Sequence, residues 1–292
     1  MGPQRSALPV AAGANLGHQD GRNVGGTMAQ AVALITGGWR GIGRACVDRL
    51  RQGGYRVALT YVPGAEPADQ IADWVATDAN LIALPLDLRD AGGPGQTIAA
   101  LCTHWGGVDI LINNAAVGSA TVAAFAKTQA EQDAAMLGIN ALGTLAMCRA
   151  FLAAPATAPE TPRKLISIAS VGGGIAAFPG FSLSDGMSKA AVAHLTRQLA
   201  AEAMAPGTDI FALCPGATDT EMFRQSTLNP LAPEARAAFL QRLPKERLIA
   251  PAEIAEVVAF LAGPHSSVLH GAVIDASMGL GVRPGRMTEF DP

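Results

Sequence analysis

The sequence predicts an α/β fold in which one doubly wound sheet of seven parallel strands carries helices on both faces. From Ala31 onward, short runs of β-branched and apolar residues alternate with longer stretches of helical period, which is typical of β-α-β units. Of the 292 residues, 49% are hydrophobic and 15% are charged, so the chain has enough apolar side chains for a substantial core. Because no polar linker interrupts the pattern, we expect a single domain.

Seven short apolar runs are the expected strands. They are residues 31–36, 56–62, 81–86, 109–113, 164–168, 209–213 and 272–274. The stretches of helical period between them include residues 43–52, 129–153, 187–203 and 252–261. Pro251 precedes the last of these stretches, at a helix start that tolerates a missing N–H.

The ends of the chain and one internal segment fall outside this pattern. Residues 1–28 are rich in Gly, Asn and small residues without an apolar period, so we expect a flexible N-terminal extension. The domain is then expected to span residues 29–283, followed by a C-terminal tail at 284–292. Residues 217–247 mix apolar and polar side chains after a late strand, where a substrate lid is expected.

Composition argues against several classes of protein. The 21 basic and 24 acidic residues give a formal charge of −3, which does not favour a nucleic-acid binder. The four cysteines and five histidines are scattered, so we expect neither a disulfide framework nor a metal site. The sequence has no run of about 18 uninterrupted apolar residues, and Arg5 before the apolar residues 8–14 is a weak signal peptide. We therefore expect a soluble, cytoplasmic protein.

A glycine-rich turn connects the first strand to the first helix. It reads Thr36-Gly37-Gly38-Trp39-Arg40-Gly41-Ile42-Gly43. Glycines at these positions let the backbone approach a pyrophosphate, whose charge meets the N–H groups at the helix N-terminus. The strand before and the helix after favour a dinucleotide site of Rossmann type over a turn that only serves packing.

The end of the second strand bears on the choice of dinucleotide. An NAD site usually places an Asp or Glu there to hold the ribose 2′-hydroxyl, but this strand ends Tyr61-Val62-Pro63, with no acid before Glu66. Arg40 in the glycine turn is placed to meet a 2′-phosphate, unless it is only a solvated turn residue. The sequence therefore favours NADP(H) over NAD(H).

Five further segments accompany the glycine turn. They are Leu86-Asp87-Leu88, Asn113-Asn114-Ala115-Ala116, Ile139-Asn140-Ala141, Ile168-Ala169-Ser170 and Cys214-Pro215-Gly216-Ala217-Thr218-Asp219-Thr220. With the turn, they resemble the motifs of the short-chain dehydrogenase/reductase family, particularly its 3-oxoacyl-carrier-protein-reductase-like members. The resemblance covers residues 30 to 279 and implies a single-domain Rossmann fold and an oxidoreductase.

The resemblance also implies the roles of individual residues. The expected cofactor-binding set is Thr36, Gly37, Arg40, Gly41, Ile42, Gly43, Asp87, Asn114, Lys189, Pro215, Gly216 and Thr220. In the family's pattern Asp87 contacts the adenine ring and Thr220 binds the nicotinamide amide. The expected catalytic set is Ser170, Asp185, Lys189 and Asn140, in which Ser170 holds the substrate's carbonyl oxygen.

One position departs from the family's pattern. The family's Y-x-x-x-K motif reads Asp185-Gly186-Met187-Ser188-Lys189 here, and the only two tyrosines, Tyr55 and Tyr61, lie near the second strand. The reaction needs a proton donor near neutral pH. Lys189 at i+4 is expected to lower the pKa of Asp185 by roughly 1–3 units, which predicts an ionised carboxylate, although burial acts in the opposite direction.

Four interpretations are open, of which the first is favoured. It is a working NADP(H)-dependent oxidoreductase in which Asp185, a relayed water, or Ser170 with Ser184 manages the proton. The second is a catalytically impaired nucleotide-binding scaffold or partner subunit of an active relative. The third is a non-redox lyase or isomerase that uses ionised Asp185 as a base. The fourth is a structural protein that binds no nucleotide.

Partners are expected on the same basis. The apolar residues of segment 217–247 suit a small, partly hydrophobic substrate, and neither nucleic acid nor membrane is expected. The resemblance implies a homodimer or homotetramer formed through the helices at 129–153 and 187–203, or a hetero-oligomer with an active relative.

Overall fold

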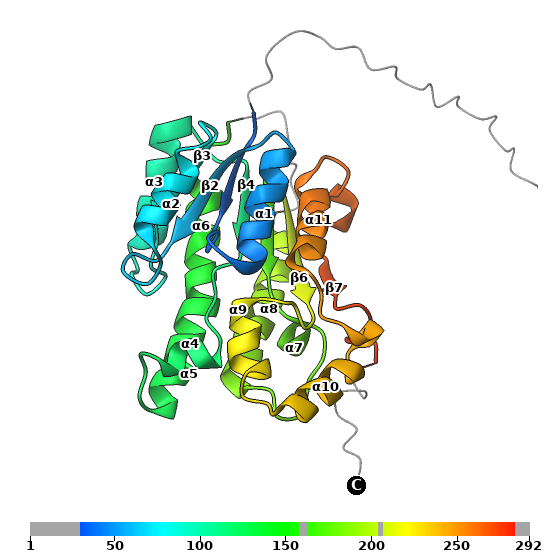
Figure 1. Ribbon diagram of the computed structural model, residues 1–292. Coiled ribbons are helices and arrows are strands. Elements are labelled where there is room, and N and C mark those ends of the chain that lie inside the picture. The colour runs from blue at the N-terminus through cyan, green and yellow to red at the C-terminus, as the bar shows by residue number, and fades with distance from the viewer. Residues whose placement is uncertain (1–29, 158–162, 204–206, 284–292) are drawn as a thin grey trace, which may run out of the picture.

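The computed structural model describes residues 30–157, 163–203 and 207–283. Seven strands form one parallel sheet in the order β3-β2-β1-β4-β5-β6-β7, with helices on both faces (Figure 1). The predicted single-domain Rossmann fold is therefore confirmed. The expected N-terminal extension, residues 1–28, and the expected tail, residues 284–292, lie outside the described residues.

All seven predicted strands are present, and each ends within two residues of its expected bounds. They are β1 Val32–Ile35, β2 Arg56–Tyr61, β3 Leu81–Pro85, β4 Ile110–Asn113, β5 Arg163–Ile168, β6 Thr208–Pro215 and β7 Val273–Ala276. The central strands β1 and β4 are buried at every residue. This explains their continuous apolar runs, since helices cover both faces of a parallel sheet.

Eleven α-helices connect or flank the strands in the described part of the chain. They are α1 Gly41–Gln52, α2 Ala68–Val75, α3 Gly93–Trp105, α4 Ser119–Ala123, α5 Gln129–Leu137, α6 Thr144–Ala153, α7 Val171–Gly174, α8 Leu183–Glu202, α9 Glu221–Phe223, α10 Pro233–Arg242 and α11 Pro251–Ala262. Two π-helical segments, η1 Gly138–Gly143 and η2 Arg224–Leu228, and two 3₁₀ turns, η3 Pro244–Glu246 and η4 Ser267–Leu269, complete them.

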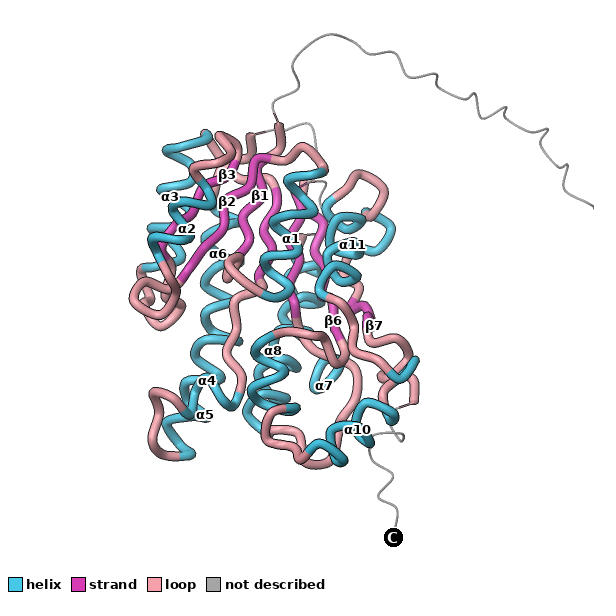
Figure 2. The backbone as a smooth tube through the Cα atoms, in the orientation of Figure 1, coloured by secondary structure: helices cyan, strands magenta, loops and turns pink. Residues whose placement is uncertain are grey.

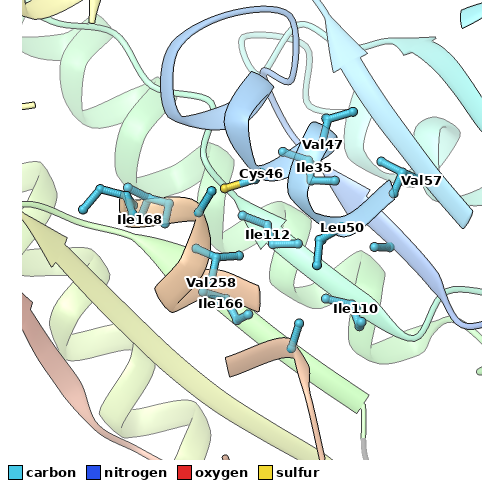
Figure 3. Close-up of a cluster of buried hydrophobic side chains, with 14 of the residues drawn as sticks. Ile35, Cys46, Val47, Leu50, Val57, Ile110, Ile112, Ile166, Ile168 and Val258 are labelled. Carbon is cyan, nitrogen blue, oxygen red and sulfur yellow. The ribbon is translucent and has the colours of Figure 1, made fainter. Parts of the chain in front are cut away.

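Two hydrophobic layers hold the helices on the sheet. On one face α1 and α11 pack against the strands, and Cys46, Leu50 and Val258 contact the side of the sheet that carries Ile35 and Ile112 (Figure 3). On the other face α3, α6 and α8 pack against the alternate strand residues. Successive strand side chains point to opposite faces, so each strand contributes to both layers.

The strand order places the site. β1 pairs with β2 on one side and with β4 on the other, so the connections after β1 and β4 leave toward opposite faces and open a crevice at the carboxyl ends of the strands. Gly37, Asn114, Ser170 and Gly216 all follow strands at this edge. In Figure 2, α4, α5, α7 and α10 lie beyond the same end of the sheet.

Two predicted helices differ from expectation in detail. The helix expected at 187–203 begins at Leu183, because the Ser182 side chain accepts a hydrogen bond from the Asp185 backbone N–H and caps it. Asp185 therefore lies in the first turn of α8 rather than in a preceding loop. The helix expected at 129–153 is continuous but contains the π segment η1.

One helical run within the described residues, Gln129–Ala153, is long and apolar enough to cross a membrane. It consists of α5, η1 and α6. Met147, Cys148 and Phe151 of the run are buried against the sheet, as in the core helix of an α/β domain. Length and composition therefore do not assign this run to a membrane.

Candidate active site

The glycine turn has the conformation that phosphate binding requires. Gly37 and Gly41 have positive φ values of 63° and 58°, a region that L side chains enter only with strain. The Gly43 position has no room for a side chain, because an added Cβ would stand 2.1 Å from the Gly37 carbonyl oxygen. The sequence thus specifies this turn by two separate needs, positive φ and close packing.

The N-terminus of α1 offers its backbone N–H groups at this turn. Its N-cap residue, Arg40, forms no side-chain capping bond with any described residue, and the first turn carries no acidic side chain. The N–H groups of Gly41, Ile42 and Gly43 begin the helix. An uncapped 12-residue helix that starts in a glycine turn fits a dinucleotide pyrophosphate, since the end of the helix dipole is positive there.

Thr36 and Asn114 support the turn from the neighbouring strand ends. The Thr36 hydroxyl oxygen accepts hydrogen bonds from the Asn114 and Ala115 backbone N–H groups, each at 3.0 Å. The Asn114 side-chain amide donates to the carbonyl oxygens of Thr36 and Gly37 at 2.9 and 3.0 Å. Both predicted cofactor residues therefore act on the shape of the turn.

Asp87 lies after β3 and is held by a charged neighbour. Arg89 donates to both of its carboxylate oxygens, at 2.6 to 3.0 Å. These bonds hold the pKa of Asp87 below its usual range. The carboxylate is therefore ionised at neutral pH and is an acceptor only.

Arg40 is paired with two carboxylates, neither of which was expected at the site from the sequence. Its Nη1 lies 2.8 Å from Glu221 Oε2 and its Nε lies 3.8 Å from Glu66 Oε1. The guanidinium therefore connects the glycine turn to the end of β2 and to α9.

Glu66 reaches the end of β2 because the chain turns back on itself. The turn contains Gly64 at φ 77°, and the Glu66 N–H donates to the Val62 carbonyl oxygen at 3.1 Å. The carboxylate in turn accepts the Val62 N–H at 2.9 Å. An acid therefore does lie at the strand end, although counting along the chain placed it too far away. The signal in the sequence was the Pro63-Gly64 turn.

The segment after β6 reaches the glycine turn as well. An added Cβ on Gly41 would stand 3.3 Å from the Thr220 methyl carbon. The Thr220 hydroxyl oxygen caps α9 by accepting the Phe223 N–H at 3.2 Å. Gly216 packs against Ser277, whose Cα would stand 3.0 Å from an added Cβ. Pro215, Gly216 and Thr220 thus lie at the same edge of the sheet as the glycine turn.

The predicted catalytic residues come from β5, η1 and α8. Ser170 follows β5, and its hydroxyl oxygen accepts the Gly172 N–H at 3.1 Å. The hydroxyl hydrogen is therefore left to donate. Lys189 Nζ donates to the Ile168 carbonyl oxygen at 3.3 Å, which connects α8 to the same strand end.

Asn140, in η1, joins α8 to the loop after β4. Its Oδ1 accepts the Val117 N–H at 2.9 Å, and its Nδ2 donates to the Val117 carbonyl oxygen at 3.0 Å and to Ser188 Oγ at 3.2 Å. Asn140 is 2% exposed. Since Ser188 precedes Lys189, Asn140 fixes the position of α8 beside the strand ends.

The expected downward shift of the Asp185 pKa is wrong in its direction. No ion pair joins Asp185 and Lys189 in the described structure, where Lys189 binds a backbone carbonyl instead. Burial raises the pKa of Asp185 above its usual range, and the Lys189 ammonium offsets only part of the rise. Burial also lowers the pKa of Lys189. Desolvation therefore outweighs the charge pair that the i+4 spacing suggested.

A second glycine contact fixes the start of α8. Gly173 has φ 86°, and an added Cβ there would stand 2.1 Å from the Gly186 carbonyl oxygen. The backbone directly after Asp185 therefore packs on the loop that follows Ser170. No motif in the sequence marks this contact.

A cleft of about 460 Å³ lies beside this segment, between the helices α4 and α5 and the start of α8. Its wall mixes apolar side chains such as Val122, Met136 and Phe181 with polar ones such as Gln132 and Ser184. The mixture suits a substrate that is partly hydrophobic.

Comparisons with known proteins agree with this geometry. The family described as enoyl-(acyl carrier protein) reductase matches residues 37–281. A 2-(R)-hydroxypropyl-CoM dehydrogenase of Xanthobacter autotrophicus is 32% identical over 246 residues, which cover 83% of this chain and 95% of the relative.

Two solved structures illustrate the likeness in fold. The Pseudomonas aeruginosa RhlG/NADP active-site complex matches with a TM-score of 0.74 and 27% identity, covering 87% of this chain and 97% of its own. A 3-oxoacyl-[acyl-carrier protein] reductase from Brucella melitensis in complex with NAD matches with a TM-score of 0.74 and 26% identity, covering 88% and 99%.

Proposed function

We propose, from the premise that the chain belongs to the short-chain dehydrogenase/reductase family, that it interconverts a carbonyl group and an alcohol with NADP(H), using Asp185 where the family has its tyrosine. The chain is an oxidoreductase of this family, and two solved structures similar to it are complexes with NADP and with NAD. The choice of cofactor and the role of Asp185 are the proposal.

The observation that carries the proposal is the state of Asp185. A proton donor must hold its proton near the working pH. Burial raises the pKa of Asp185, and Lys189 donates to the Ile168 carbonyl oxygen instead of forming an ion pair with the carboxyl. Burial thereby shifts Asp185 toward the neutral acid, the form that we propose protonates the substrate's oxygen.

The remaining residues position the reacting groups. Ser170 can donate its hydroxyl hydrogen to the carbonyl oxygen, because no described residue accepts that hydrogen while the hydroxyl oxygen accepts the Gly172 N–H. Asn140 and Lys189 hold α8 against the ends of β4 and β5. The nicotinamide, when bound, supplies or accepts the hydride. In the oxidation direction the Asp185 carboxylate takes the proton back.

The preference for NADP(H) rests on Arg40. A guanidinium suits a phosphate because its N–H groups form a planar fork, and Arg40 lies in the glycine turn that would hold the dinucleotide. Glu66 at the end of β2 opposes this preference by its charge. The proposal is that Arg40 outweighs it.

A non-redox lyase or isomerase is less well supported. That alternative needs an ionised Asp185 as a base, whereas burial favours its neutral form.

We also propose assembly as a cytoplasmic homodimer or homotetramer through α5–α6 and α8, because Leu142, Leu183 and Met187 on these elements are exposed by 64%, 84% and 59%.

The test of Asp185 is a near-isosteric substitution. Asp185→Asn removes the proton without changing the shape, so kcat for reduction of a ketone panel that includes 3-oxoacyl thioesters should fall by about 10²–10⁴-fold. The Kd for NADPH should stay within about twofold, since the pyrophosphate site is unchanged. Asp73→Asn, on the exposed face of α2, is the matched control.

Equal turnover in Asp185→Asn and the parent protein would exclude the carboxyl as proton donor. Asp185→Tyr is the complementary variant. A gain in carbonyl reduction would mean that the rest of the site still accepts the family's phenol.

A further inference from the structure

We infer that Glu221, the first residue of α9, is a specificity-determining residue that competes with the 2′-phosphate of NADP(H) for the Arg40 guanidinium. The inference rests on the proposed NADP(H) site at Arg40. It adds a residue from segment 217–247, the expected substrate lid, to the choice of cofactor.

The first observation is the ion pair itself. Arg40 Nη1 donates to Glu221 Oε2 at 2.8 Å across 181 positions of sequence. The residue before α9 also packs on the glycine turn, because the Thr220 methyl carbon would stand 3.3 Å from a Cβ added to Gly41. The contact between Arg40 and Glu221 is therefore built into the fold rather than reached only by two long side chains.

The second observation is the difference between the two acids around Arg40. The Glu66 side chain is only 11% exposed, and one of its oxygens accepts the Val62 N–H. Glu221 is 54% exposed, and among the described residues its second oxygen accepts a hydrogen bond only from the Gln225 side chain, at 2.8 Å. Glu66 is thus fixed at the end of β2, while Glu221 is the partner that can move away.

The charges around Arg40 determine how a phosphate can enter. One guanidinium faces two carboxylates, so the cluster carries a net charge of −1 before any ligand arrives. A bidentate phosphate contact needs two guanidinium N–H groups on one edge of the fork, and Glu221 already occupies Nη1. A 2′-phosphate that takes the edge with Nη1 must therefore displace Glu221, and on the edge with Nε it meets Glu66, whose Oε1 lies 3.8 Å from that nitrogen; a ribose 2′-hydroxyl has no such requirement.

Removal of the Glu221 charge should then help one cofactor only. Both side chains of the pair are more than half exposed, and exposed pairs are worth about 0–1 kcal/mol. In Glu221→Gln we accordingly expect the Kd for NADPH to fall about two- to fivefold, while the Kd for NADH stays within experimental error.

The experiment titrates the full chain by calorimetry with four probes: NADPH, NADH, 2′,5′-ADP and 5′-AMP. The two shorter probes carry or lack the 2′-phosphate without a nicotinamide, so the result does not depend on turnover. Glu234→Gln is the matched control, because Glu234 is an exposed acid in the first turn of α10 within the same segment. Only NADPH and 2′,5′-ADP should bind more tightly to Glu221→Gln.

A double-mutant cycle tests the route of the effect. If Glu221 acts through Arg40, then Glu221→Gln in an Arg40→Ala background should leave the Kd for NADPH unchanged. An equal gain for NADPH and NADH, no gain for either, or a gain that persists without Arg40 overturns the inference.

The failure of the proposed cofactor preference gives a different pattern. If only the inference about Glu221 is wrong, the parent protein still binds NADPH tightly and Arg40→Ala still weakens that binding. If Arg40→Ala does not weaken NADPH binding, or if neither dinucleotide binds the parent protein, the proposed preference fails and the inference fails with it.

Discussion

The glycine turn before α1 and the glycine segment before α8 use the same steric device for different ends. In each, an added Cβ would stand 2.1 Å from a backbone oxygen: Gly43 from that of Gly37, and Gly173 from that of Gly186. The first contact tightens a turn that leads into the N-terminus of α1, where we propose that the dinucleotide binds. The second presses two separate segments together, the loop after Ser170 and the start of α8, beside the cleft lined by Phe181 and Ser184.

The difference teaches how each half of the site is packed. In the cofactor half a local turn packs on itself, Gly43 against Gly37. In the catalytic half the backbone after Asp185 packs on the loop after Ser170. The first contact is local in sequence, whereas the second depends on the assembled fold.

The largest expected effect comes from filling the second contact. Gly173→Ala adds overpacking against the Gly186 backbone to a positive φ of 86°, and should lower the free energy of unfolding by about 3 kcal/mol. Gly180→Ala is the control, since it has φ 78° with open space around it. Urea denaturation of both variants separates the steric cost from the conformational one. Equal losses of unfolding free energy in the two variants would show that the contact with the Gly186 backbone adds no cost beyond that of the positive φ.

The next effect comes from filling the first contact. Gly43→Ala should lower the free energy of unfolding by about 2 kcal/mol and weaken NADPH binding about tenfold, because the turn must open to accept the methyl group. Gly95→Ala in α3, where nothing lies within 4 Å, should instead be neutral or slightly stabilising. Fluorescence titration beside thermal unfolding checks both. A Gly43→Ala protein with unchanged affinity would contradict the assignment of the turn.

The smallest expected effect is in the pH dependence of turnover and concerns the catalytic half of the site. In the proposed mechanism Asp185 must hold its proton to reduce a carbonyl, and burial raises its pKa above the ordinary value of 3.8. With cofactor saturating, kcat for reduction should therefore be high below the raised pKa and fall by about tenfold per pH unit above it, while alcohol oxidation rises through the same range. In Asp185→Tyr, the fall in kcat for reduction should move to higher pH. If the fall occurs at the same pH in Asp185→Asn as in the parent protein, a group other than Asp185 causes it.

The elements that the sequence predicted are those that local pattern determines. β1 and β4 are buried on both faces, so their apolar runs are continuous and easy to recognise. The glycine turn is recognisable within eight residues. The start of α8 was missed by four residues, because the capping side chain of Ser182 lies before the apolar period begins.

The parts that sequence reasoning missed depend on distance in space. Glu66 returns to the end of β2 through a turn, and Glu221 reaches Arg40 from the segment after β6. The protonation of Asp185 depends on how much water the fold excludes, which no i+4 spacing reveals. These features become visible only when the strands are assembled.

The π segment Gly138–Gly143 determines which way the two halves of this helix face. A π turn closes on the fifth residue rather than the fourth, so the run from α5 to α6 contains one residue more than an α-helix of the same rise. Everything after it is rotated by about 100° around the axis, which lets Asn140 face Val117 while Phe151 faces the sheet. The segment has the form of one extra residue in an otherwise regular helix. A deletion there would restore a regular helix, and either the amide or the core side chain would then face the wrong way.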